Sequence, residues 1–167
     1  QSMEQGAYGL SSGLIYIPGT YAKTDEVTEL AKVAAGYGGV YFTHLRNESN
    51  NLLEALGEAI QIGTEADMPV QVSHFKVMGQ PNWGMVEHSI AMVEKAREAG
   101  LDITADQYPY IASSTGLGAS VPSSTWKGGR TIDRLRDPVE RQKVVEGFRA
   151  RGNWDKIQIA SLSNAAD

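Results

Sequence analysis

Two of the three histidines stand at matching positions in consecutive strand-like segments. His44 follows an apolar run at residues 40–42, and His74 follows a similar run at residues 70–72, each after one hydroxyl residue. Parallel strands joined by one helix lie close together, so both imidazoles would emerge at the carboxyl edge, where α/β folds build their sites. A lone histidine at a strand end is more often structural, but the matched pair favours a site. Because neutral imidazoles bind divalent metals through their ring nitrogens, the pair predicts a metal centre.

A cation stands two residues beyond each histidine, and hydroxyl side chains gather farther along the chain. Arg46 and Lys76 would lie at the rim of the same edge, where a guanidinium or an ammonium can bind an anionic group. Tyr108, Tyr110 and Ser114 offer neutral hydroxyl donors that suit a carboxylate. The alternatives are solvated loop cations, packed tyrosines and turn-forming serines. Together these residues favour a binding site for a small anionic molecule.

The elements that carry these residues repeat at nearly constant spacing. Strand-like runs begin near residues 40, 70 and 103, with helical patterns between them and another helical pattern that begins at Thr24. A glycine-interrupted strand precedes them within residues 6–21. Strands that alternate with helices indicate parallel strands and right-handed crossovers. The pattern predicts an α/β fold, either part of a (β/α)8 TIM-type barrel or a doubly wound sheet.

Apolar residues recur at helical spacing within each predicted helix, which predicts one buried face for each. The expected inward residues are Val27, Leu30, Ala31, Val33 and Ala34 in the first helix, Leu52, Leu53, Leu56, Ala59, Ile60 and Gly63 in the second, and Val86, Ile90, Val93 and Ala96 in the third. His88 falls beside these positions in the third helix and is expected at the surface.

The last third of the sequence predicts a long loop, a helix and a final strand. Residues 111–130 are rich in Ser, Thr and Gly and form a candidate substrate loop. A helix is expected to begin at Asp137 and Pro138, with proline in its first turn. The alternation at residues 154–160 predicts a strand. No linker composition interrupts the chain, so residues 1–167 are expected to form one α/β segment.

Composition limits the classes of function. The 167 residues are 41% hydrophobic and 21% charged, which is typical of globular proteins. A net charge of −5 without a Lys/Arg stripe argues against nucleic acid as a partner, and no apolar run is long enough to predict a membrane helix. Without cysteine, a metal site must use histidine and carboxylate, and a cytoplasmic location is expected. Both ends look cut, so we expect a piece of a longer protein.

Four ordered motifs carry a family resemblance. They are Gly9-Leu-Ser-Ser-Gly-Leu-Ile-Tyr-Ile-Pro-Gly19, Thr43-His-Leu-Arg-Asn-Glu48, Ser73-His-Phe-Lys76 and Asp106-Gln-Tyr-Pro-Tyr-Ile-Ala-Ser-Ser-Thr115. Together they resemble the N-acyl-D-amino-acid deacylases (D-aminoacylases) of the metal-dependent amidohydrolase superfamily. The resemblance covers nearly the whole chain and weakens after about Arg130. It implies a segment of a (β/α)8 barrel that runs from about the fourth strand to the seventh.

The resemblance also implies roles for individual residues. His44 and His74 would bind Zn²⁺ or another divalent metal, which would polarise the acyl carbonyl of a small N-acyl amino acid and activate water. Lys76, Tyr108 and Ser114 would bind the substrate, with Arg46 at the rim. The family's catalytic carboxylate and its first-strand His-x-His pair have no match here. No catalytic residue is therefore expected within this chain, and the chain alone would lack a complete catalytic centre.

Three alternatives stay open. A cyclic-amidase or dihydroorotase-like enzyme is one, although its relatives carry a lysine in the strand that corresponds to residues 6–21, where this sequence has none. A non-catalytic α/β module that binds a small anion or a partner is the second. The third is an inactive piece of a barrel whose exposed strand edges favour self-association.

Overall fold

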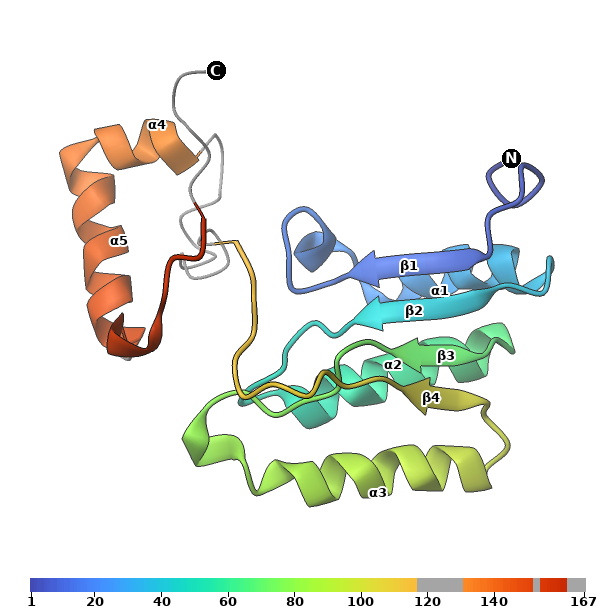
Figure 1. Cartoon of the computed structure of the whole chain (residues 1–167). Helices are drawn as coiled ribbons and strands as arrows, with labels where there is room; N and C mark the ends of the chain where they lie inside the picture. The colour runs from blue at the N-terminus through green and yellow to red at the C-terminus, as the bar shows by residue number, and fades with distance from the viewer. Residues whose placement is uncertain (117–130, 152–153, 162–167) are drawn as a thin grey trace. The chain divides into compact units, whose positions relative to one another are not determined.

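The structure of the protein is a computed structural model that describes residues 1–116, 131–151 and 154–161 (Figure 1). The chain divides into two units, Gln1–Ile111 and Ala112–Asp167. The expected single α/β segment over residues 1–167 stays a prediction. Within the described residues, no helix is both long and apolar enough to cross a membrane.

The first unit is built on a sheet of four parallel strands. These are β1 (Gly9–Gly13), β2 (Val40–His44), β3 (Val70–Val72) and β4 (Ile103–Ala105), which pair in the order β1-β2-β3-β4. Phe42 is paired with Ser11 on one side and Gln71 on the other. The predicted parallel strands are confirmed, and their order in the sheet follows their order in the sequence.

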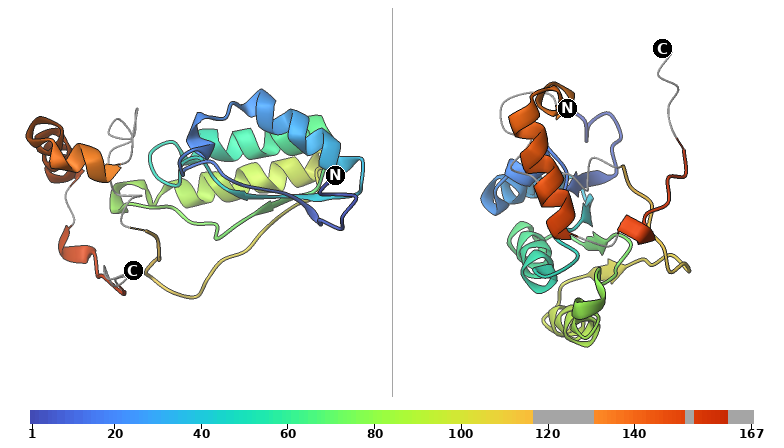
Figure 2. Two further views of the ribbon diagram at one scale, coloured as in Figure 1. Left: turned by 90° about the horizontal axis from the view of Figure 1, so that it is seen from above. Right: turned by 90° about the vertical axis from the view of Figure 1, so that its left-hand side faces the viewer.

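Three helices connect the strands, and all of them cover the same face of the sheet (Figures 1 and 2). They are α1 (Thr24–Ala35), α2 (Leu52–Ala66) and α3 (Met85–Glu98), with short 3-10 turns at Gly19–Tyr21 and Gln80–Asn82. This one-sided arrangement follows from right-handed crossovers between parallel strands. The other face carries no helix in this unit and holds exposed side chains such as Phe42 and Thr104.

The core lies between the sheet and its helices. Tyr41, Leu56 and Ile62 are fully buried there, together with apolar residues of β3 and β4. Close approach of α2 to β3 depends on Gly63, because a Cβ atom at this position would lie 2.2 Å from Cγ2 of Val70. The apolar core fixes the strands and therefore the loops at their carboxyl ends.

The predicted buried faces of two helices are partly wrong. Leu30 and Val33 of α1 are 54% and 62% exposed, and Val86 and Ile90 of α3 are also exposed. Each of these helices packs against α2 on one side, and no other helix of the first unit covers its far side. The apolar stripe is therefore wider than the surface that these two helices bury within the described unit.

The second unit contains α4 (Thr131–Arg136), which the sequence did not predict, and α5 (Pro138–Arg151). The predicted start of α5 is confirmed, since Oδ1 of Asp137 accepts hydrogen bonds from the backbone N–H groups of Val139 and Glu140 at 2.8 and 3.2 Å.

The predicted strand at residues 154–160 is wrong. A 3-10 turn occupies Trp154–Lys156, and the following described residues pair with no strand, although they alternate in polarity. Most of the predicted substrate loop, residues 117–130, lies outside the described residues.

Candidate metal centre

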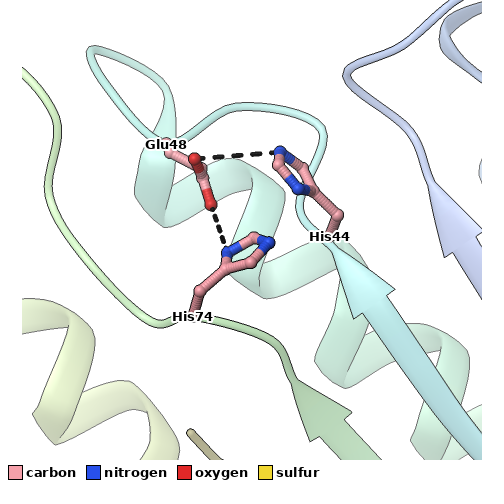
Figure 3. A group of neighbouring side chains, drawn as sticks. All are labelled: His44, Glu48 and His74. Carbon is pink, nitrogen blue, oxygen red and sulfur yellow. Dashed lines mark ion pairs between the residues drawn. The ribbon is translucent and has the colours of Figure 1, made fainter. Parts of the chain in front are cut away.

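His44 and His74 come from neighbouring parallel strands and meet at the carboxyl edge of the sheet (Figure 3). His44 is the last residue of β2, and His74 is the second residue after β3. Their ring centroids lie 4.4 Å apart, with the ring planes at 73°. The proximity of the two imidazoles, predicted from their matching positions, is therefore present in the structure.

The backbone at His74 turns through the left-handed region, with a φ of 42°. Few non-glycine residues adopt this conformation unless surrounding contacts hold them there. Asp106, just beyond β4, supplies such contacts: its Oδ1 accepts the backbone N–H of His74 at 2.6 Å, and its Oδ2 accepts Nε2 of Gln71 at 2.8 Å. The strained turn thus gives the imidazole of His74 a fixed direction.

Glu48 lies between the two imidazoles and was not assigned a role from the sequence. Its side chain is 5% exposed, in the loop that joins β2 to α2. Oε1 lies 3.1 Å from Nδ1 of His74, and Oε2 lies 3.8 Å from Nε2 of His44 (Figure 3). A buried carboxylate requires positively charged or hydrogen-bonding partners, so this placement marks Glu48 as part of the site.

The three residues fit a divalent metal. His44, Glu48 and His74 each offer one ligand atom, and these atoms lie within 4.8 Å of one another. Nε2 of His44 is buried and has no hydrogen-bond partner among the described residues. Burial lowers the pKa of His44; the Glu48 carboxylate opposes this shift, while His74 and Lys76 add to it. A neutral imidazole with a free lone pair is the form that binds zinc.

Lys76 joins this cluster. Its Nζ donates hydrogen bonds to Oε1 of Glu48 at 2.6 Å and to the carbonyl oxygen of His74 at 3.1 Å, and lies 3.0 Å from Nδ1 of His74. Nζ also lies 5.8 Å from the ring centroid of Tyr108. The structure therefore brings one predicted substrate-binding residue, Lys76, beside His74, and a second, Tyr108, near Lys76.

The side chain of Arg46 makes contacts with residues outside the cluster of His44, Glu48, His74 and Lys76. Its guanidinium binds both carboxylate oxygens of Glu58 in α2 at 2.8 Å and the carbonyl oxygens of Thr20 and Ala22 at 3.0 and 2.8 Å. These contacts favour a structural role, and the predicted binding of substrate by Arg46 stays a prediction. Ser114 is exposed and belongs to the second unit, so its predicted role is likewise untested.

No protein-family model matches the chain. Over 117 residues it is 43% identical to a D-aminoacylase from Alcaligenes xylosoxydans xylosoxydans, a match that covers 70% of this chain and 24% of that protein. An N-acyl-D-aspartate deacylase from the same organism is 35% identical over 172 residues, which cover 99% of this chain and 33% of the relative. The chain thus spans about a quarter to a third of the length of these curated relatives.

Solved structures agree with these matches. A crystal structure of D-aminoacylase that defines a novel subset of amidohydrolases matches with a TM-score of 0.63 at 41% identity, over 66% of this chain and 23% of that one. An N-acyl-D-glutamate deacylase from Bordetella bronchiseptica, complexed with zinc and a phosphonate inhibitor, matches with a TM-score of 0.61 at 39% identity, over 63% of this chain and 22% of that one. The four parallel strands with their helices are therefore part of a (β/α)8 barrel, as predicted. The chain belongs, as a segment, to the family of the D-aminoacylases and other N-acyl-D-amino-acid deacylases within the amidohydrolases.

Proposed function

We propose that this chain is part of a metal-dependent hydrolase that cleaves the amide bond of N-acyl-D-amino acids. The observation that carries the proposal is the cluster of His44, Glu48 and His74 at the carboxyl edge of the barrel strands. The similarity to D-aminoacylases supports the reaction and the stereochemistry of the substrate. Zn²⁺ or another divalent cation is the proposed cofactor, with His44 and His74 as two of its ligands.

When bound, the metal supplies Lewis-acid chemistry toward the acyl carbonyl and the attacking water. The residues of this chain hold it and orient the substrate. Lys76 is mostly buried and carries the positive charge that attracts the carboxylate of an N-acyl amino acid. Tyr108 lies close to the Lys76 ammonium, which places a hydroxyl-bearing ring on the same side of the site. The general base is proposed to come from a part of the protein beyond this chain.

Replacing His44 or His74 with alanine in the longer protein tests the proposal. Each change removes one imidazole ligand, so we expect the bound metal and the rate of N-acyl-D-amino-acid hydrolysis to fall together, by at least about a hundredfold in metal affinity. Metal content measured by atomic emission and hydrolysis measured by amine release report the two effects.

His88→Ala is the matched control, because His88 is exposed on α3 and outside the cluster. It should leave both quantities unchanged. If His44→Ala and His74→Ala keep wild-type metal content and activity, the proposed site is wrong.

Hydrolysis of cyclic amides in preference to N-acyl-D-amino acids would instead support the dihydroorotase-like alternative, and a protein that binds no metal would support the non-catalytic module.

Two further expectations from the sequence stay predictions. One is self-association through the free edges of β1 and β4, which the sheet order leaves unpaired within the described unit. The other is a cytoplasmic location.

A further inference from the structure

One acidic side chain, Glu48, lies close to His44, His74 and Lys76 together. It binds the Lys76 ammonium at 2.6 Å and lies 3.1 Å from His74 and 3.8 Å from His44. We propose that Glu48 is a positioning residue: it neutralises and holds the Lys76 ammonium beside the histidine pair, and so keeps that pair able to bind a divalent cation. This inference rests on the proposed function.

The positive charge of Lys76 would otherwise oppose the metal. Nζ lies 3.0 Å from Nδ1 of His74, and its side chain is mostly buried. Two cations at such short range repel each other, and burial weakens the screening by water and salt. The carboxylate of Glu48 faces both Lys76 and the imidazoles. Its negative charge therefore offsets the repulsion between the Lys76 ammonium and a metal cation bound by the imidazoles.

The hydrogen bonds also indicate that Glu48 orients the ammonium group of Lys76. An ammonium has three N–H donors, and Nζ of Lys76 donates to Oε1 of Glu48 at 2.6 Å and to the carbonyl oxygen of His74 at 3.1 Å. Of these two acceptors, only Glu48 carries a full negative charge. Without it, the ammonium keeps the weaker carbonyl acceptor, and its position relative to a substrate carboxylate is no longer fixed.

A direct role of Glu48 as a third metal ligand is the competing explanation. Oε1 of Glu48 already binds Lys76 at 2.6 Å, whereas Oε2 lies 3.8 Å from Nε2 of His44. The short contact therefore favours charge pairing with Lys76 over ligation. The two explanations differ in one respect that can be measured: only charge pairing makes the effect of Glu48 depend on the presence of Lys76.

A double-mutant cycle separates them. Glu48→Gln keeps the size of the side chain and an acceptor oxygen but removes its charge, and Lys76→Met removes the cation while keeping an apolar stem of similar length. Zn²⁺ affinity is measured by competition with a chelator on the longer protein. We expect Glu48→Gln alone to weaken Zn²⁺ binding by about 10- to 100-fold, the range seen when a partner of a metal ligand is lost. In the double variant, affinity should return to within about threefold of wild type.

Glu54→Gln is the matched control, because it removes one exposed negative charge from α2 without touching the cluster. Thermal unfolding of every variant establishes that it is folded. The inference is overturned if Glu48→Gln binds Zn²⁺ as tightly as wild type, or if the double variant binds as weakly as Glu48→Gln alone. A wild-type protein that binds no Zn²⁺ overturns the proposed function itself, which distinguishes the two failures.

Discussion

The contacts of Arg46, which include its ion pair with Glu58, connect three segments of the chain. Arg46 follows β2, Glu58 lies in α2, and the same guanidinium binds carbonyl oxygens just before α1. Burial alone would raise the pKa of Glu58, but hydrogen bonds from Arg46 and Thr24 and the charge of Arg46 outweigh it, so the pKa of Glu58 is lowered. The pair therefore stabilises the folded protein when Glu58 is ionised.

This stabilisation depends on pH in a defined direction. Because the folded pKa of Glu58 lies below the ordinary value of 4.5, the contribution is complete above that value and is lost as the pH falls through the lowered pKa. At neutral pH, Glu58→Gln should lower the free energy of unfolding by about 1–3 kcal/mol, as expected for a hydrogen bond to a charged group. Urea unfolding at neutral and acidic pH should show the gap between wild type and variant closing in acid.

Glu29→Gln provides a control, since Glu29 pairs with Lys32 at the exposed surface of α1. An exposed pair of this kind should contribute less than about 1 kcal/mol. A gap for Glu58→Gln that is no larger than that of the control, or that widens in acid, would contradict the structural role given to Arg46.

Glu48 illustrates what residue patterns cannot reveal. His44 and His74 were predicted because they hold matching positions at the ends of neighbouring strands, and Lys76 because it lies two residues beyond His74 at the same edge. Glu48 stands in a loop, where sequence spacing does not fix the direction of a side chain. The one available signal was chemical: a lysine beside two candidate ligands requires a counter-charge, and Glu48 is the acidic residue of the His44 motif.

At the scale of elements, the strand and helix positions of the first unit followed from the sequence, whereas the buried faces followed only in part. Glycine and proline residues, such as Gly36 and Pro69, end the elements where expected because they disfavour helix continuation. Burial of Leu30 or Val86 depends instead on which neighbours cover a helix. A stripe of apolar residues predicts that a helix face can be buried. It does not predict which element of the described unit covers that face.

The packing of α2 against β3 gives a prediction that uses two glycines of one helix. A Cβ atom at Gly63 would lie 2.2 Å from Cγ2 of Val70 and 3.1 Å from the carbonyl oxygen of Met68, so Gly63→Ala forces the helix away from the strand. We expect a loss of about 1–3 kcal/mol in the free energy of unfolding, the usual cost of overpacking a core. Chemical denaturation measures this loss.

Gly57→Ala is the matched change in the same helix. A Cβ atom at Gly57 would have Cε of Met92 as its nearest neighbour at 3.8 Å, an ordinary contact. Because alanine favours helix more than glycine, this variant should gain up to about 1 kcal/mol. Equal effects of the two substitutions would show that α2 does not approach β3 as closely as described.

At the scale of the whole molecule, this chain is proposed to supply one segment of a larger site. It spans about a quarter to a third of the length of its curated relatives, and its described residues place two imidazoles, one carboxylate and one ammonium at a common edge. The carboxyl edge of parallel barrel strands is where several strands can contribute to one centre. A complete catalytic centre is therefore proposed to form only when further strands of the barrel surround this edge.

Anomalous X-ray diffraction at the zinc absorption edge, on crystals of the longer protein grown with Zn²⁺, tests the central claim most directly. The account predicts an anomalous peak within about 2.0–2.1 Å of one ring nitrogen of His44 and one of His74. A zinc peak bound by other residues, with neither imidazole within bonding distance, would contradict it.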